Sequence, residues 1–203
     1  MIDREKLKTN YIINLDAISA LKEFPDRTFD CCITSPPYYG LRDYKAEGQI
    51  GREESPEEYL NKLIKVFREV KRVLKKEGTL WVVIGDSYAG TRSKKKYKDP
   101  KNIEGRSGQK ESITEKLSGY KAKDLMGIPW QLALKLREDG WYLRSDIIWH
   151  KENAMPESCR DRPSRSYEHI FLLSKARKYF YNFDAMKEPI KEISKKRYMR
   201  ARG

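Results

Sequence analysis

An apolar run, an amphipathic helix and a second apolar run follow one another in the first half of the chain, and this order strongly constrains the fold. The first run is FDCCIT at 29–34 and the second is TLWVVIG at 79–85. Between them, Ser55 and Pro56 open a helix with one apolar face, which we expect to end at Gly78. Apolar strands joined through a helix are typical of a parallel sheet buried on both faces. The sequence therefore predicts an α/β fold with mostly parallel pairing.

The rest of the chain continues this alternation. A short strand is expected at 11–14 (YIIN), and Asp16 opens a short helix after it. A second amphipathic helix is expected at 127–140 (GIPWQLALKLREDG), followed by strands at 143–150 (LRSDIIWH) and 167–174 (YEHIFLLS). The sequence contains no internal repeat, and its 203 residues predict a single domain.

Polar loops follow the first three predicted strands. They hold Asp16, the sequence TSPPYYG at 34–40, and the pair Asp86 and Ser87. In α/β sheets the reactive loops lie beyond the carboxyl ends of the strands. We therefore expect these loops to form one site, although a turn role for Asp86 and Ser87 is an equal alternative.

The charge of the chain is strongly basic and unevenly distributed. The net charge is +13, and residues 91–123 alone hold 11 Lys/Arg against 4 Asp/Glu. The tail at 186–203 holds 7 against 2. A concentrated excess favours a polyanionic partner such as DNA or RNA, whereas a heat-adapted Lys/Glu surface would spread its charges. We expect 91–123 to be a long, mobile insertion that contacts phosphates, with Lys94, Lys95 and Lys96 among the DNA contacts.

Several classes of protein are disfavoured by composition. Two histidines and three scattered cysteines give no zinc-ligand spacing, so no metal is expected. No apolar run is long enough to span a bilayer, and the N-terminus lacks the apolar core of a signal peptide. The sparse cysteines fit a reducing cytoplasm. We expect a cytoplasmic protein that makes no contact with a membrane.

The proline corner after the apolar run at 29–34 points to a specific chemistry. Pro36 and Pro37 fix two φ angles and remove two backbone donors, while their carbonyls stay able to accept hydrogen bonds. Ser35 adds a hydroxyl and Tyr38 adds a flat aromatic face. Acceptors beside an aromatic ring suit a nucleobase amine that has left its helix. The alternative is a simple turn with a surface tyrosine.

The corner and its surroundings also resemble a known family. TSPPYYG after FDCCI is similar to the catalytic motif of DNA amino-methyltransferases, which modify exocyclic nitrogens of cytosine or adenine. The resemblance runs in order over roughly residues 11–189, through NLDAISALKEFPDRTFD, GTLWVVIGDSYAG, the segment around WHKEN and the segment around SYEHIFLLSK. It implies a Rossmann-like methyltransferase sheet, S-adenosylmethionine as methyl donor, and double-stranded DNA with a flipped target base as substrate.

The resemblance also implies roles for individual residues. Ser35, Pro36, Pro37 and Tyr38 would be the catalytic loop, with Ser35 and the Pro36 carbonyl accepting from the amine and Tyr38 stacking on the base. The cofactor would contact Asp16, Thr34 and Ser35, and the alternative for Asp16 is a helix N-cap without a ligand. The residues expected to border the extruded base are Tyr39, Trp149, Lys151 and Asn153.

The target base and the completeness of the site are open at this point. A serine before the prolines, where many adenine-modifying members carry aspartate, favours the N4 amine of cytosine, and adenine N6 is the alternative. The family's glycine-containing phenylalanine loop, which comes last in this motif order, is absent from the 203 residues. We therefore expect the sheet to lack a strand or two and the cofactor pocket to lack a wall.

The absent glycine loop leaves two hypotheses. In the first, a C-terminal part or a second chain supplies the missing side of the cofactor pocket. In the second, the protein binds nucleic acid on the same scaffold without catalysis. RNA is a weaker alternative to DNA as the substrate. A role in restriction–modification, or in marking by a phage or microbe, follows by analogy alone.

Overall fold

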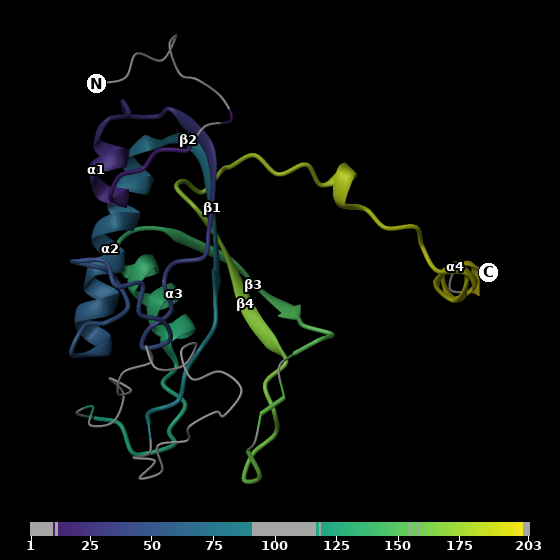
Figure 1. The fold of residues 1–203 in the computed structure, drawn as a ribbon. Helices are drawn as coiled ribbons and strands as arrows, with labels where there is room; N and C mark the ends of the chain where they lie inside the picture. Colours follow the sequence, from purple (N-terminus) through teal and green to yellow (C-terminus); the bar gives the residue numbers. More distant parts are fainter. Residues whose placement is uncertain are drawn as a thin grey trace.

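The computed structural model describes residues 10, 12–90, 117, 119–154, 156–157 and 159–200. Figure 1 shows a sheet with helices gathered on one side and a C-terminal tail that leaves the body. The elements in chain order are α1 (Ala17–Lys22), β1 (Phe29–Thr34), α2 (Pro56–Val73), β2 (Leu74–Ile84), α3 (Ile128–Glu138), β3 (Tyr142–His150), β4 (Tyr167–Ser174), η2 (Asp184–Met186) and α4 (Glu192–Arg200).

The described strands form one sheet in the order β1-β2-β4-β3. β1 and β2 are parallel, whereas β4 is antiparallel to both β2 and β3. The predicted α/β fold is confirmed. Mostly parallel pairing is wrong for the described strands, because β3 and β4 pair directly across the loop that joins them and β4 then lies against β2. β1, β2 and β3 nevertheless run in the same direction.

The core lies between the sheet and the helices α2 and α3. Ser55 caps α2 by accepting from the Glu58 amide at 3.1 Å, and Pro56 occupies the first turn. α2 ends at Val73 rather than near Gly78, since Leu74 already pairs with Phe29 in the sheet. The buried side chains that fill this core include Tyr59, Leu60, Leu63, Phe67, Leu80, Val82, Ile84, Leu132, Leu136 and Leu173.

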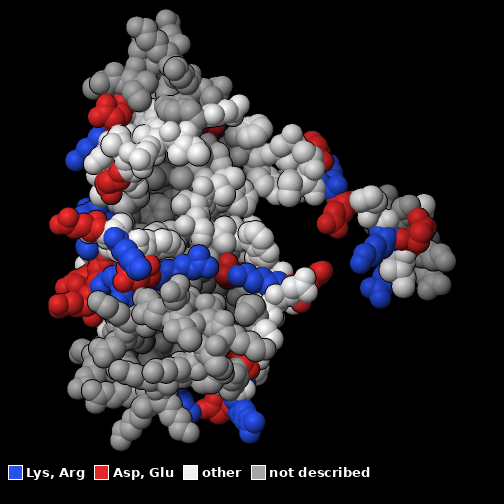
Figure 2. Space-filling view, viewed as in Figure 1, with Lys and Arg blue, Asp and Glu red and all other residues white. Residues whose placement is uncertain are grey.

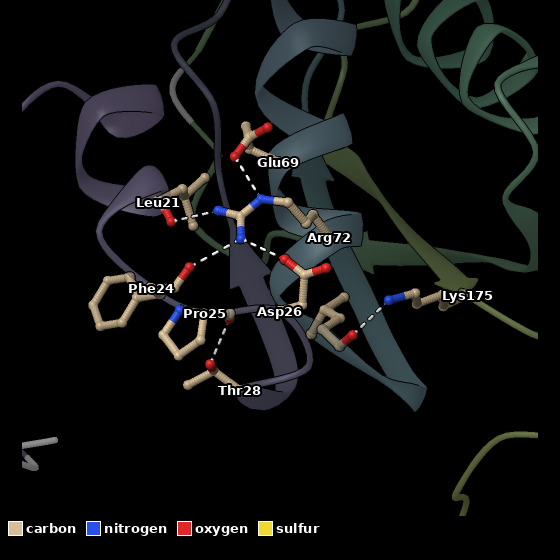
Figure 3. A network of polar contacts seen from close by, with 9 residues as sticks. Leu21, Phe24, Pro25, Asp26, Thr28, Glu69, Arg72 and Lys175 are labelled. Atoms are coloured by element: carbon tan, nitrogen blue, oxygen red, sulfur yellow. Dashed lines mark hydrogen bonds and ion pairs between the residues drawn. The ribbon is translucent and has the colours of Figure 1, made fainter. Parts of the chain in front are cut away.

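Arg72, in the last turn of α2, fastens α1 to the rest of the fold (Figure 3). Its guanidinium donates to the carbonyls of Leu21 and Phe24, both at 2.9 Å. It also pairs with Asp26 at 2.8 Å and with Glu69 at 2.9 Å. These bonds satisfy carbonyls at the C-terminal end of α1, where the helix leaves them without partners of its own. Arg72 thus holds the end of α1 against α2.

β1 is an edge strand, and none of its six residues is buried, which overturns the expectation that both of its faces are buried. Ile33 on β1 is 75% exposed. The strand expected at 11–14 is not formed over the described residues 12–14, which are irregular.

A groove of about 920 Å³ opens between β1, α1, α2 and the segment before α1. One end of the groove is formed by Thr34, Ser35, Pro36 and Pro37. The rest of the lining is mostly apolar and includes Ile13, Leu15, Leu21, Phe24, Phe29, Ile33, Leu63, Phe67 and Val70.

The tail beyond β4 runs away from the sheet and ends in α4 (Figure 1). Its large apolar side chains are exposed: Phe180, Phe183, Met186, Ile190, Ile193 and Met199. Exposed apolar side chains in such number are typical of a surface that packs against other polypeptide. Over the described ranges, no helix is both long and apolar enough to cross a bilayer.

Candidate active site

Two buried tyrosines, Tyr39 and Tyr59, contact the proline corner from the core side. The Tyr59 hydroxyl on α2 donates to the Pro37 carbonyl at 2.8 Å. The Tyr39 ring packs against Tyr59 with centroids 5.3 Å apart, and its hydroxyl donates to the Glu53 carbonyl at 3.2 Å. The Gly40 amide donates to the carbonyl of Gly51 at 2.8 Å. The corner after β1 is therefore fixed before any ligand arrives.

Ser35 and Tyr38 belong to a chain of polar contacts that ends on β4. Ser35 Oγ donates to Tyr38 Oη at 3.3 Å, and Tyr38 Oη donates to Glu168 Oε2 at 2.9 Å. The other carboxylate oxygen of Glu168 pairs with the Lys151 ammonium. Four polar side chains from β1's loop, β3's end and β4 are thus joined in one group.

Gly85, directly after β2, makes room for this arrangement. A Cβ at Gly85 would lie 3.0 Å from the ring of Tyr38 and 3.5 Å from Glu168 Cγ. Both distances are to side-chain atoms of residues that belong to the hydrogen-bonded set of Ser35, Tyr38, Glu168 and Lys151. A glycine at this position therefore lets Tyr38 lie close to the end of β2.

The environment of Tyr38 keeps its phenol protonated. Burial raises the pKa of Tyr38 to about 12, the hydrogen bond from Ser35 opposes the shift, and the Glu168 carboxylate adds to it. A neutral phenol retains its proton for a hydrogen bond and its ring for stacking. Tyr38 is half-buried, so part of the ring is accessible from solvent.

Asp16 caps α1 in this structure. Its Oδ1 accepts from the amides of Ile18 at 3.0 Å and Ser19 at 3.1 Å. The capping alternative is therefore realised, and a capping aspartate can still contact a ligand through its other oxygen. Leu15 and Ala17, on either side of Asp16, line the groove together with the predicted cofactor residues Thr34 and Ser35.

The four residues predicted to border the extruded base do not all lie together in the structure. Lys151 reaches the group that contains Tyr38 through Glu168. Trp149 is 51% exposed and faces Glu168 in the β3–β4 ladder, so the two side chains share one face of the sheet. Asn153 lies in an exposed turn after β3. Tyr39 is only 1% exposed, so its ring supports the corner from inside and does not border a surface pocket.

Asp86 contacts the start of α3. Its side chain is fully buried and accepts from the amides of Gly127 and Ile128, both at 3.0 Å, at the start of α3. Ser87 Oγ donates to the Tyr39 carbonyl at 3.4 Å, which ties the loop after β2 to the proline corner. Among the described residues, no group of three or more His, Cys, Asp or Glu side chains is placed to hold a metal ion.

Sequence reasoning gave no role to Tyr59 or Glu168, although both lie within predicted elements, and it did not assign the close approach of Tyr38 to Gly85. Their roles depend on how α2, β2 and β4 are placed against the corner, which no local pattern encodes. A charged residue inside a strand followed by an apolar run was the one available signal for Glu168.

The surface charge of the described residues is mixed on the face drawn in Figure 2. Lys and Arg side chains form a band across it, interspersed with Asp and Glu. The predicted DNA contacts Lys94, Lys95 and Lys96 lie outside the described residues, as does most of the basic segment 91–123.

Comparison with family models gives a match over residues 29–203 to the N6/N4 methyltransferase model, described as DNA methylase. Type II methyltransferase M.SmaI of Serratia marcescens is 51% identical over 183 residues, which cover 90% of this chain and 62% of the relative. Type II methyltransferase M.Cfr9I of Citrobacter freundii is 50% identical over 173 residues, or 85% of this chain and 57% of the relative. The chain thus spans about three fifths of these relatives.

Two solved structures share the fold at low sequence identity. A DNA modification methylase of Thermus thermophilus, described as putative and solved with S-adenosyl-L-methionine, matches with a TM-score of 0.54 and 24% identity, over 89% of this chain and 56% of that one. PvuII DNA methyltransferase, described as cytosine-N4-specific, matches with a TM-score of 0.55 and 18% identity, over 81% and 48%. These matches confirm the methyltransferase fold. The family match and the relatives at about half identity show that this chain belongs to the N6/N4 DNA methylase family.

Proposed function

We propose that this chain carries the catalytic loop of an S-adenosylmethionine-dependent DNA methyltransferase that modifies the N4 amine of cytosine. The observation that carries the proposal is the corner after β1, where Ser35 and Tyr38 share a hydrogen bond at the end of the apolar groove. Acceptor oxygens and an aromatic face then meet at one point beside a cavity. This is the arrangement that an extruded nucleobase amine requires.

Cytosine is favoured over adenine by Ser35 ahead of the prolines. One structural neighbour, PvuII DNA methyltransferase, is described as cytosine-N4-specific, which supports the choice by analogy. The relatives at about half identity are Type II methyltransferases, and a role in restriction–modification on double-stranded DNA is proposed by the same analogy. Adenine N6 is the alternative target.

The groove suits S-adenosylmethionine. Its volume of about 920 Å³ lies in the range of small-molecule sites, and its mostly apolar lining can cover an adenosine group. Asp16, Thr34 and Ser35 would hold this molecule, which supplies the methyl group. Ser35 Oγ and the Pro36 carbonyl would accept from the target amine, and the Tyr38 ring would stack on the base. Accepting from both N–H groups favours a tetrahedral nitrogen with a localised lone pair.

Additional polypeptide would complete the site. Among the described strands, β1 has one edge without a paired strand. The groove beside β1 has a mostly apolar lining and is open to solvent. The tail also exposes several large apolar side chains. The relatives extend well beyond the matched region. We propose that a further segment, in the same or in a second chain, pairs with β1 and closes the groove.

A second candidate is a non-catalytic nucleic-acid-binding subunit on the same scaffold. The open groove favours it, because a cofactor bound there would be covered on one side only. Under this alternative, substitutions of basic residues would weaken DNA binding. Changes at the corner would have no effect.

The variant Ser35→Ala separates the two candidates, with Ser194→Ala in the exposed tail as a matched control. Methyl transfer from labelled S-adenosylmethionine to DNA would be measured beside DNA binding by fluorescence anisotropy. We expect Ser35→Ala to lower methylation about 100-fold, the magnitude typical of one polar group aimed at a reacting centre, with an unchanged dissociation constant for DNA. Equal methylation by Ser35→Ala and wild type would contradict the proposed role of the corner.

A further inference from the structure

Glu168 belongs to the hydrogen-bonded chain of side chains that begins at Ser35 and continues through Tyr38. Its carboxylate is 18% exposed and contacts the Lys151 ammonium through one oxygen and the Tyr38 hydroxyl through the other. An ionised carboxylate accepts hydrogen bonds and has no proton to donate. The direction of the bond between Tyr38 and Glu168 is therefore fixed, with Tyr38 as the donor.

This direction determines the next bond along the group. A tyrosine hydroxyl has one proton, and the proton of Tyr38 is used toward Glu168. Tyr38 Oη can then only accept from Ser35 Oγ, which lies 3.3 Å away. The single proton of Ser35 thus points at Tyr38, and the lone pairs of Ser35 Oγ face away from it.

We propose that Glu168 is a positioning residue that orders the hydroxyls of Tyr38 and Ser35, so that Ser35 Oγ presents lone pairs to the target amine. The inference rests on the proposed function for its catalytic meaning. If the order were reversed, the Ser35 proton would point toward the amine and oppose an incoming N–H donor. Lys151 contributes by contacting Oε1 of Glu168, which leaves Oε2 to accept from Tyr38.

The geometry around Glu168 supports a dedicated contact. β4 lies between β2 and β3, and Glu168 pairs with Trp149 of β3, while the next residue, His169, pairs with Ile84 at the end of β2. Gly85 at the end of β2 leaves the space in which Tyr38 and Glu168 meet. Trp149 faces Glu168 across the ladder. A rigid strand carries the carboxylate, which is the condition for holding a hydroxyl in one orientation.

Glu168→Gln tests the inference with nearly the same shape. Because the Lys151 ammonium only donates, the amide oxygen turns toward it and the amide N–H faces Tyr38 Oη. The order of the two hydroxyls then reverses. We expect kcat to fall at least about 10-fold with KM values for DNA and S-adenosylmethionine within about 2-fold of wild type. Glu168→Asp, which keeps the carboxylate, should recover part of the loss.

Tyr38→Phe removes the link while keeping the aromatic face. In a Tyr38→Phe background, Glu168→Gln should change kcat less than about 2-fold, because Glu168 acts through the missing hydroxyl. The control is Glu57→Gln on α2, which removes a carboxylate paired with Lys135 away from the corner. An additional loss of about 10-fold in the double variant would overturn the inference, since Glu168 would then act without Tyr38.

A second measurement is independent of catalysis. In a double-mutant cycle of urea unfolding, Glu168→Gln and Tyr38→Phe should be non-additive by about 3-fold or more in the unfolding constant, as expected for residues in direct contact. Additive effects would overturn the inference even in an active protein. Coupling without any methylation by wild type would instead reject the proposed function, and with it the catalytic meaning of the ordered hydroxyls.

Discussion

The hydroxyl of Tyr59 donates to the carbonyl of Pro37 at 2.8 Å, from a side chain with no exposed surface. This contact joins the first turns of α2 to the second proline of the corner. It uses the Pro37 carbonyl, whereas the Pro36 carbonyl is the one proposed to accept from the target amine. The stiffness of the corner thus comes from the core as well as from the two proline rings.

Tyr59→Phe should weaken both stability and catalysis. It leaves the partly buried Pro37 carbonyl without its donor, which costs about 1 kcal/mol. Urea unfolding and the rate of methylation would be measured together. Tyr142→Phe, at a half-exposed tyrosine of β3, is the control and should change neither. Wild-type stability in Tyr59→Phe would mean that the contact does not hold the corner.

Gly85→Ala should impair methylation more than folding. The new Cβ would approach the Tyr38 ring to 3.0 Å, tighter than most Cβ contacts in proteins, so the ring must shift by a few tenths of an ångström. A side chain can move at low cost, and the unfolding midpoint should change little. The displaced ring would lose its bond to Glu168, and we expect kcat to fall about 10-fold. An unaltered kcat would show that the position of Tyr38 is not critical.

Ile33→Lys should reduce self-association of the chain. Ile33 is 75% exposed on an edge strand, and unpaired edges with apolar side chains promote contact between chains. Light scattering at increasing protein concentration should show less association for Ile33→Lys than for wild type. Leu134→Lys on α3, where Leu134 is 43% exposed, is the control and should behave as wild type. Equal effects of both substitutions would indicate general solubility rather than the β1 edge.

The fold should lose stability at alkaline pH. Burial raises the pKa of Tyr38 and of Tyr39 to about 12, and raises that of Tyr59 further, from an ordinary value of 10.0. The unfolded chain therefore releases these protons first, so their contribution is complete below pH 10 and is lost as the pH rises to about 12. Urea unfolding across this interval should show the decline, and Tyr39→Phe should make it shallower. A flat profile would contradict the burial of these phenols.

Much of the fold could be predicted from local patterns. The apolar face of α2 and its capping by Ser55 were readable, as were the apolar strands β2 and β4. The corner at Ser35–Tyr38 was also identified, because consecutive prolines after a strand are a local signal. The order of the strands was not readable, since the position of β4 between β2 and β3 depends on pairings distant in sequence.

The site was predicted only in part, because its contacts also depend on residues distant in sequence. Lys151 was expected near the base and is joined to the corner, but only through Glu168, which no motif singled out. Tyr39 was expected at the pocket because it follows Tyr38, yet consecutive residues of a turn can point to opposite sides, and the core takes its ring. The burial of β1 was overestimated because an apolar run does not reveal which elements pack on the faces of a strand.

Nucleoside mass spectrometry tests the central claim most directly. The purified chain would be incubated with S-adenosylmethionine and unmethylated DNA of mixed sequence, and the DNA would then be digested to nucleosides. The account predicts N4-methylcytosine, with far less of it from Ser35→Ala than from wild type. N6-methyladenine would keep the methyltransferase and reject cytosine as the target. The absence of any methylated base would contradict methylation by this chain alone, and the same result in the presence of the segment that closes the groove would contradict the proposed function.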